Sequence, residues 1–190
     1  MYRQLAAFPN LLTLLRLVII PFIVINLVGG NYGWALGLLV LAGISDFFDG
    51  MLARVLKQGT ELGQYLDPIA DKMLLSTLFL VLSIMHDIPW KYTVLVFSRD
   101  VTILVVAGVL YITNSLRDFQ PSIFGKLNTA AQIAAVFFVM LHRVTGVAWI
   151  ELARRLGLYA TFAFTLISGF HYIWLVAHRL RANAGAGDPA

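Results

Sequence analysis

The sequence predicts an all-α protein, a bundle of about six membrane-spanning helices, and both its composition and its patterning lead to this prediction. Hydrophobic residues make up 59% of the 190 residues and charged residues only 13%, whereas charged residues make up about 25% of ordinary soluble domains. The mean hydropathy of +0.81 is high for a water-soluble globule. The apolar residues form runs long enough to cross a bilayer, which takes about 20 residues of helix. We expect one membrane domain over residues 1–181 and a disordered, Ala/Gly-rich tail over residues 182–190.

Clear breaks separate the first three expected helices. Residues 11–29 form the first apolar run, which contains Arg16 and lacks a small-residue cleavage site behind it. We therefore interpret it as a retained helix and not as a signal peptide. The turn-forming cluster Gly29–Gly33 separates it from the second run, residues 33–54, and the third run covers residues 67–86.

Three further runs complete the expected bundle. They cover residues 90–113, 125–142 and 157–178. Breaks at His86–Pro89, at Pro121 and at Gly146 bound them. The charged segment Glu151–Arg155 precedes the last run and is also compatible with an interfacial helix that leads into it.

The distribution of Lys and Arg favours an orientation with both termini in the cytoplasm. The cytoplasmic side then holds Arg3, Arg54, Lys57, Arg117, Lys126, Arg179 and Arg181, and the outer side holds Lys91, Arg143, Arg154 and Arg155. The net charge of +4 and the pI of about 9.6 favour anionic lipids or phosphorylated ligands over nucleic acid as partners. Because the chain has no cysteine, disulfides, thiolate metal sites and a Cys nucleophile are excluded. We expect a multi-pass protein of the inner (cell) membrane.

Two pairs of aspartates interrupt the apolar runs. Asp46 and Asp49 are spaced i, i+3 in the second run, and Asp67 and Asp71 are spaced i, i+4 in the third. Each spacing places both carboxylates on one helix face. A charged side chain at the centre of a membrane helix costs about 2.5–3.5 kcal/mol, so we expect these carboxylates to face a wet cavity or to be neutralised by cations. Carboxylates without accompanying His or Cys favour Mg²⁺ or Mn²⁺ over zinc.

Small and basic residues follow the first acidic pair. Gly50 and Ala53 allow another backbone or a ligand to approach closely. Arg54, Lys57 and Thr60 come next, at the expected inner surface of the membrane, where they could hold a phosphate or a nucleotide. A carboxylate–metal centre beside such a surface indicates phosphoryl or pyrophosphate chemistry.

These residues stand at fixed spacing, in the pattern Asp46-x2-Asp49-Gly50-x2-Ala53-Arg54-x8-Gly63-x3-Asp67-x3-Asp71. The pattern resembles the full signature of the CDP-alcohol phosphotransferases, the CDP-alcohol phosphatidyltransferase family. The segment Pro9-Asn10-x2-Thr13-x2-Arg16 is similar to the amino-terminal entry segment of that family. The six expected runs also match the family's fold over nearly the whole chain.

The resemblance implies a reaction and a role for each motif residue. Asp46, Asp49 and Asp67 would bind a pair of divalent cations. Asp71 would contribute to the metal shell and act as general base for the acceptor hydroxyl, whose alkoxide attacks CDP-diacylglycerol and displaces CMP. The residues that the resemblance assigns to the nucleotide pocket are Gly50, Ala53, Arg54, Thr60 and Gly63. It also implies a homodimer. We expect the active site to face the cytoplasm, because the two Asp pairs lie near the inner ends of the second and third expected spans.

The fourth and fifth runs bear on the acceptor alcohol. Their segments Ser98-Arg99-Asp100 and Gly125-Lys126-x-Asn128-Thr129-x2-Gln132 are similar to the branch of the family that handles glycerol phosphates. Cationic side chains suit the acceptor's phosphate, and the candidates are Arg99, Arg117 and Lys126. We favour glycerol 3-phosphate as acceptor. Asp100 and Asn128 lean toward the alternative, a CMP-forming cardiolipin synthase that uses phosphatidylglycerol.

Two other classes of protein carry acidic residues within the membrane. Aromatic prenyltransferases of the UbiA type use Mg²⁺ and Asp-rich motifs, but they are usually longer and space their aspartates differently. An ion transporter of this size would need two halves or an oligomer, and the sequence holds no internal repeat. Binding of CMP or CDP-diacylglycerol distinguishes the transporter from the favoured enzyme.

Overall fold

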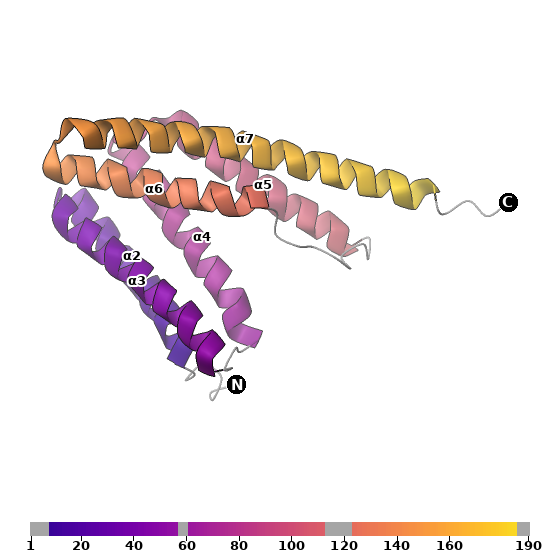
Figure 1. Cartoon of the computed structure of the whole chain (residues 1–190), viewed down its shortest axis with the longest axis horizontal. Helices are drawn as coiled ribbons and strands as arrows, with labels where there is room; N and C mark the ends of the chain where they lie inside the picture. The colour runs from indigo at the N-terminus through magenta and orange to yellow at the C-terminus, as the bar shows by residue number, and fades with distance from the viewer. Residues whose placement is uncertain (1–7, 57–60, 113–122, 186–190) are drawn as a thin grey trace. The chain divides into compact units, whose positions relative to one another are not determined.

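The computed structural model describes residues 8–56, 61–112 and 123–185, with side chains for residues 13–48, 69–105, 123 and 125–170. The described residues form helices α2 (Phe8–Val28), α3 (Tyr32–Leu56), α4 (Glu61–Ile84), α5 (Trp90–Ile112), α6 (Ile123–Thr145) and α7 (Ala148–Gly185), and contain no strand (Figure 1). The predicted all-α class is therefore confirmed for the described part of the chain.

Each expected run corresponds to one helix, with differences at the ends. Helix α4 begins at Glu61, ahead of the expected start at residue 67. Helix α7 begins at Ala148, so Glu151–Arg155 belongs to the same continuous helix as the last run. This helix continues to Gly185, past the boundary expected at Ala182, and the rest of the expected tail lies outside the described residues.

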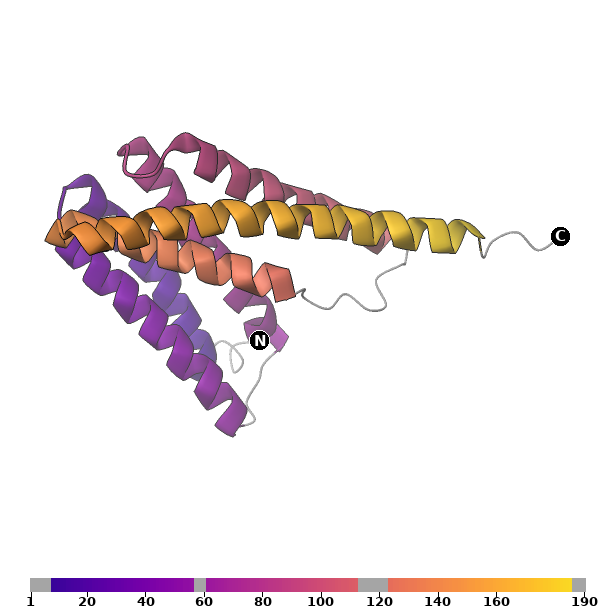
Figure 2. The ribbon, with the colours of Figure 1, turned by 45° about the horizontal axis from the view of Figure 1, so that its top comes forward.

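The chain divides into two compact units, and unit 1 comprises residues 1–89 and 136–154. In it, α2 packs against both α3 and α4, as the two ribbon views show (Figures 1 and 2). The buried face of α2 is a stripe with the three- and four-residue spacing of a helix, formed by Thr13, Arg16, Ile20, Ile23 and Leu27. This stripe places one charged side chain, Arg16, in the core of the three-helix packing.

Unit 2 comprises residues 90–135 and 155–190, and therefore α5, the first part of α6 and most of α7. Helices α6 and α7 approach closely at Gly157, where an added Cβ would lie 3.1 Å from the Cα of Ala135. The rings of Tyr92 and Phe162 meet edge to face at a centroid distance of 6.1 Å and join α5 to α7. Small and aromatic side chains thus set the spacing of the helices in this unit.

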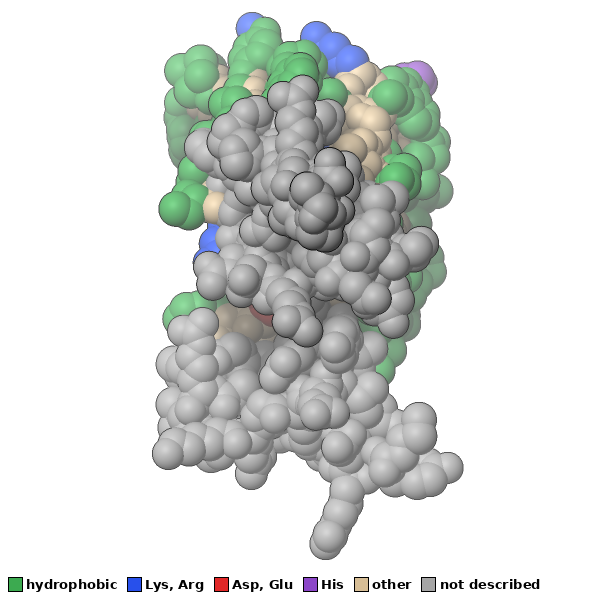
Figure 3. All heavy atoms as spheres, turned by 90° about the vertical axis from the view of Figure 1, so that its right-hand side faces the viewer, with side chains coloured by type: hydrophobic (Ala, Val, Ile, Leu, Met, Phe, Trp, Pro, Cys, Tyr) green, Lys and Arg blue, Asp and Glu red, His purple; other side chains and the backbone are tan. Residues whose placement is uncertain are grey.

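Many large apolar side chains lie on the surface of the described residues. The described part of the face in Figure 3 is mostly hydrophobic, and exposed side chains include Trp34, Phe47 and Phe170. By length and composition, one described segment, Gly125–Thr145, could cross a membrane, and Thr13–Val28 and Tyr32–Phe48 are shorter apolar helices. The six-span arrangement stays a prediction.

Candidate active site

One arginine joins the two acidic pairs of the motif. Arg16 of α2 donates through Nη1 to Oδ1 of Asp71 on α4 at 2.5 Å, and through Nη2 to Oδ1 of Asp46 on α3. The Arg16 side chain is only 1% exposed, whereas the carboxylates of Asp46 and Asp71 are 50% and 45% exposed. The structure thus brings one aspartate from each pair to a shared cation.

The local sequence explains why this arginine points inward. Arg16 occupies the buried stripe of α2, three residues after Thr13 and four before Ile20. A buried charge costs several kcal/mol unless it is paired. Asp46 and Asp71 are the only aspartates on the facing helices α3 and α4 whose side chains the structure describes. Their carboxylates compensate that charge, which fixes how the three helices meet.

The electrostatics of this centre leave room for a further cation. One guanidinium faces two carboxylates, so the three groups carry a formal charge of −1 when the carboxylates are ionised. The carboxylates remain half-exposed, and carboxylate oxygens are the ligands that Mg²⁺ and Mn²⁺ prefer. Because Asp46 and Asp71 already converge on a cationic group, these two residues fit a divalent-cation site.

The other two motif aspartates lie on the same helices. Asp49 follows Asp46 in α3 and Asp67 precedes Asp71 in α4, but their side chains are not among those described. Among the side chains that are described, no three of His, Asp or Glu form a metal-binding group. The cluster of four carboxylates therefore stays a prediction.

The structure describes no side chain for the residues of the expected nucleotide pocket. The backbones of Gly50, Ala53 and Arg54 belong to α3 and that of Gly63 belongs to α4, whereas Thr60 lies outside the described residues. Their assignment to the nucleotide stays a prediction.

The candidate acceptor residues fall in unit 2 where they are described. The Nη1 of Arg99 donates to Oδ1 of Asp100 at 2.9 Å, and its Nη2 donates to the Ser168 hydroxyl on α7 at 3.1 Å. Lys126 is exposed on α6, and Arg117 lies outside the described residues. The Arg99 guanidinium is thus largely buried, forms an ion pair with Asp100 and is hydrogen-bonded to Ser168.

Buried donors of unit 2 belong to Arg99, Asn128 and Gln132, which the sequence marked for their resemblance to the glycerol phosphate branch but without predicting their contacts. Thr165 donates to Oδ1 of Asn128 at 2.8 Å, so α7 contacts both Arg99, through Ser168, and Asn128. The Nε of Arg99, the Nδ2 of Asn128 and the Nε2 of Gln132 are buried and have no partner among the described residues. The contact of Thr165 with Asn128 joins positions 37 residues apart, which local spacing could not predict.

Arg16 was also recognised only in part. The sequence marked it as a charge in the first apolar run and as part of the entry segment, without assigning it a partner. Its contacts lie 30 and 55 positions away in the chain, which local spacing cannot predict.

Comparison with known proteins identifies the family of the chain. The profile of the family described as CDP-alcohol phosphatidyltransferase matches residues 6–176. A Mycobacterium tuberculosis protein named "Probable phosphatidylglycerophosphate synthase" is 34% identical over 177 residues, which cover 80% of this chain and 84% of the relative. A CDP-diacylglycerol–glycerol-3-phosphate 3-phosphatidyltransferase of Aquifex aeolicus is 38% identical, with 64% of this chain and 68% of the relative covered. A cardiolipin synthase (CMP-forming) of Rattus norvegicus is 33% identical over 67% of this chain and 48% of its own.

The family match includes the entry segment with Arg16, the whole aspartate motif and the polar residues of α5 and α6. It lends no support to the prenyltransferase or the transporter reading. The chain belongs to the CDP-alcohol phosphatidyltransferase family and is a transferase of phospholipid biosynthesis.

Proposed function

We propose that this enzyme transfers a phosphatidyl group from CDP-diacylglycerol to glycerol 3-phosphate and releases CMP, in a reaction that depends on divalent cations. One observation supports the proposal above all. Asp46 and Asp71, from the two helices of the family motif, both contact the buried guanidinium of Arg16. The name of the Aquifex aeolicus relative supports the choice of donor and acceptor.

The aspartates and Arg16 have different tasks in this proposal. Two divalent cations held by Asp46, Asp49, Asp67 and Asp71 would supply positive charge against the pyrophosphate of the donor. Arg16 holds the carboxylates of Asp46 and Asp71 at a fixed separation from inside the helix packing. Because its single charge does not balance both carboxylates, the centre still attracts cations.

We assign the role of general base to Asp71. Its carboxylate is half-exposed and accepts a hydrogen bond from Arg16 at Oδ1, which supports this role because an acceptor hydroxyl could reach it. It takes the proton of the acceptor hydroxyl, the alkoxide oxygen forms a bond to the phosphorus that carries the diacylglycerol, and the bond from that phosphorus to the CMP oxygen breaks. A positioned base contributes about 10²–10⁴-fold to such a step.

The buried donors of unit 2 support a small, oxygen-rich acceptor. Arg99, Asn128 and Gln132 each keep a buried N–H without a partner among the described residues, and an unsatisfied buried donor costs about 1–3 kcal/mol. A phosphate or hydroxyl oxygen of glycerol 3-phosphate would remove that cost. The second candidate acceptor is phosphatidylglycerol, which the neutral Asn128 and the rat relative favour.

We also propose that the chain is a multi-pass protein of the inner membrane with its active site on the cytoplasmic side. Helix α2 supports this reading because its exposed side is as apolar as its buried side, with exposed Leu15, Val18, Phe22 and Ile25. A helix that is apolar all round is typical of a membrane span. A donor lipid would then enter sideways from the inner leaflet, and the resemblance to the family favours a homodimer.

A panel of acceptors tests the proposed function. Purified protein in detergent receives labelled CDP-diacylglycerol with Mg²⁺ or Mn²⁺, and CMP release is followed with glycerol 3-phosphate, phosphatidylglycerol, inositol, inositol phosphate or serine. We expect release with glycerol 3-phosphate alone. Release with phosphatidylglycerol alone would identify a cardiolipin synthase instead, and no release with any acceptor would contradict the proposal.

A further inference from the structure

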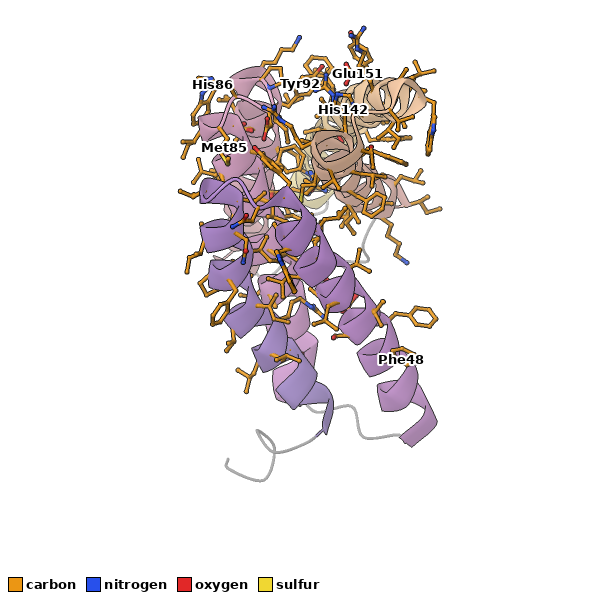
Figure 4. The ribbon with its side chains drawn as sticks, turned by 90° about the vertical axis from the view of Figure 1, so that its left-hand side faces the viewer. Phe48, Met85, His86, Tyr92, His142 and Glu151 are labelled. Atoms are coloured by element: carbon orange, nitrogen blue, oxygen red, sulfur yellow. The ribbon has the colours of Figure 1, made fainter. Side chains whose placement is uncertain are left out.

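A polar cavity lies at the other end of unit 1 from the aspartate motif. Its volume is about 360 Å³. It is lined by His86, Asp87, Val139, His142, Arg143 and Arg154, all of unit 1. His86 and His142 lie at one end of the unit, with His142 beside Glu151, and Phe48 lies toward the other end (Figure 4). From Asp71 to the end of α4 at Ile84 the helix rises about 20 Å, so the cavity is separate from the proposed active site.

The acidic group of the cavity is already compensated. The side chain of Asp87 is 1% exposed. Its Oδ1 accepts a hydrogen bond from Nε of Arg143 at 2.5 Å, and its Oδ2 accepts one from the Tyr32 hydroxyl at 2.6 Å. Tyr32 precedes the expected span 33–54, and burial, followed by the hydrogen bond to Asp87, raises the pKa of Tyr32 to about 12. The phenol therefore stays protonated and donates to Oδ2 of Asp87, while Arg143 holds Oδ1.

Several donors remain available around the cavity. Arg143 is 49% exposed, and its Nη1 makes no hydrogen bond among the described residues. The Nδ1 of His142 is buried without a partner among the described residues, and its Nε2 lies 3.5 Å from Glu151. An imidazolium donates from both ring nitrogens, whereas a neutral imidazole donates from one and accepts at the other. His86 is exposed at the rim. An exposed guanidinium and imidazole nitrogens without a partner among the described residues favour a ligand that brings several oxygens and can also carry a proton, such as phosphate.

His86 occupies a backbone position that normally selects another residue. Its φ of 62° lies in the left-handed region, and the amide of Asp87 closes the end of α4 on the carbonyl of Leu82 at 2.8 Å. Glycine is the usual residue at such a helix end because it has no Cβ to strain the backbone. A histidine at this position is better explained by its side chain, which contributes to the cavity, than by the turn itself.

The surroundings place the cavity at the level of lipid headgroups in the proposed orientation. Trp34 and Trp149, close in the chain to Tyr32 and Glu151, are 75% and 64% exposed. Exposed tryptophans gather at the boundary between the hydrocarbon core and the headgroups. A cavity of this size also falls within the range of small-ligand sites, about 300–1,000 Å³.

We propose that this cavity is a second anion site, which binds a phosphate group through Arg143, His142 and His86. The phosphate belongs either to free inorganic phosphate or to the phosphodiester of an anionic lipid headgroup. The site is independent of the transfer reaction, since it lies at the opposite end of α4.

Phosphate titration of the full-length protein tests this proposal. Inorganic phosphate is titrated calorimetrically into the chelator-treated protein in a zwitterionic detergent, with chloride of equal ionic strength as reference. We expect Arg143→Gln to weaken phosphate binding about tenfold, as for a lost charge-assisted hydrogen bond. Arg155→Gln serves as the matched control. It also removes one arginine charge, but Arg155 lies on α7 and does not line the cavity.

A second variant keeps the test informative if Arg143→Gln fails to fold. His86→Gly removes the imidazole and relieves the positive φ, so the melting temperature should not fall while phosphate binding weakens about threefold or more.

The lipid source is tested by native mass spectrometry after purification with phosphatidylglycerol. Retention of the lipid in the wild type and its loss in His86→Gly would identify the lipid headgroup as the source of the phosphate. Absence of both phosphate and lipid binding, or binding unchanged in both cavity variants, would overturn the proposal. Phosphate binding that is lost in Arg99→Gln but kept in His86→Gly would show that the anion binds in unit 2, which would also overturn the proposal.

Discussion

Arg16 joins the two acidic pairs of the aspartate signature without belonging to that signature itself. Its guanidinium, 1% exposed, contacts one carboxylate from each of two helices. Removing one partner of a buried ion pair typically costs 3–5 kcal/mol, and solvent screening at the half-exposed carboxylates reduces that cost here. Arg16 therefore contributes both to the packing of α2 and to the placement of Asp46 and Asp71.

We predict that Arg16→Gln lowers the free energy of unfolding by about 1–3 kcal/mol and kcat by at least about tenfold, because the two carboxylates lose their common partner. Arg16→Lys should recover less than the full activity, because an ammonium cannot reproduce the fork that binds two carboxylates. Thermal unfolding and steady-state kinetics on both variants check this. Wild-type stability and kcat in Arg16→Gln would show that Arg16 contributes neither to the packing nor to the placement of the two carboxylates.

A separate prediction concerns the acceptor side. Lys126→Ala should raise the KM for glycerol 3-phosphate about tenfold, as expected for loss of a charged hydrogen bond, while the KM for CDP-diacylglycerol changes little. Lys91→Ala provides the control, since Lys91 is also an exposed lysine of unit 2 and lies over the ring of Tyr92. An acceptor KM that does not move would exclude Lys126 from phosphate binding.

At the scale of the helices, periodicity and turn residues predicted all six elements to within a few residues at most ends. They failed at the start of α4 and at both ends of α7, where charged residues continue the helix beyond the apolar run. Pairwise contacts between helices were not predictable. The contact of Arg16 with Asp71 and that of Thr165 with Asn128 join distant positions, and the sequence pattern shows which face is apolar but not which helix covers it.

The close approach of α6 and α7 yields a prediction of its own. Gly157→Ala should destabilise the protein by about 1–3 kcal/mol, because the added Cβ would lie 3.1 Å from the Cα of Ala135, a backbone atom that cannot move alone. Gly169→Ala is the matched control on the same helix, where a Cβ meets nothing within 4 Å. Thermal unfolding of the two variants should therefore differ; equal melting temperatures would mean that the helices do not pack at Gly157.

For the whole molecule, composition and the exposed apolar side chains support a membrane protein, and the family match supports the same conclusion. The number of helices that cross the bilayer and their direction depend on the lipid environment and on a small difference in Lys and Arg content between the two sides. Local sequence does not settle these properties. The four motif aspartates were predictable as a set from their spacing, whereas the shared arginine and the cavity around Arg143 needed the folded chain.

The proposed topology can be tested directly because the chain has no cysteine. A cysteine introduced at Val147, an exposed residue between α6 and α7, should react with a membrane-impermeant maleimide in intact cells. Lys57→Cys, in the expected cytoplasmic segment, should react only after the membrane is opened. The reverse pattern would invert the orientation, and labelling of both in intact cells would contradict the multi-pass arrangement.

CMP release measures whether the motif aspartates carry a cation-dependent transfer. Release from CDP-diacylglycerol and glycerol 3-phosphate is measured before chelation, after chelation, and after Mg²⁺ or Mn²⁺ is restored, in the wild type, Asp49→Asn and Asp71→Asn. We predict that chelation abolishes release and that Mg²⁺ or Mn²⁺ restores it in the wild type. Asp49→Asn should remain folded, bind metal weakly and release no CMP, and Asp71→Asn should lose at least about 10²-fold in rate. Wild-type release by Asp49→Asn, or release that persists in chelator, would contradict the account.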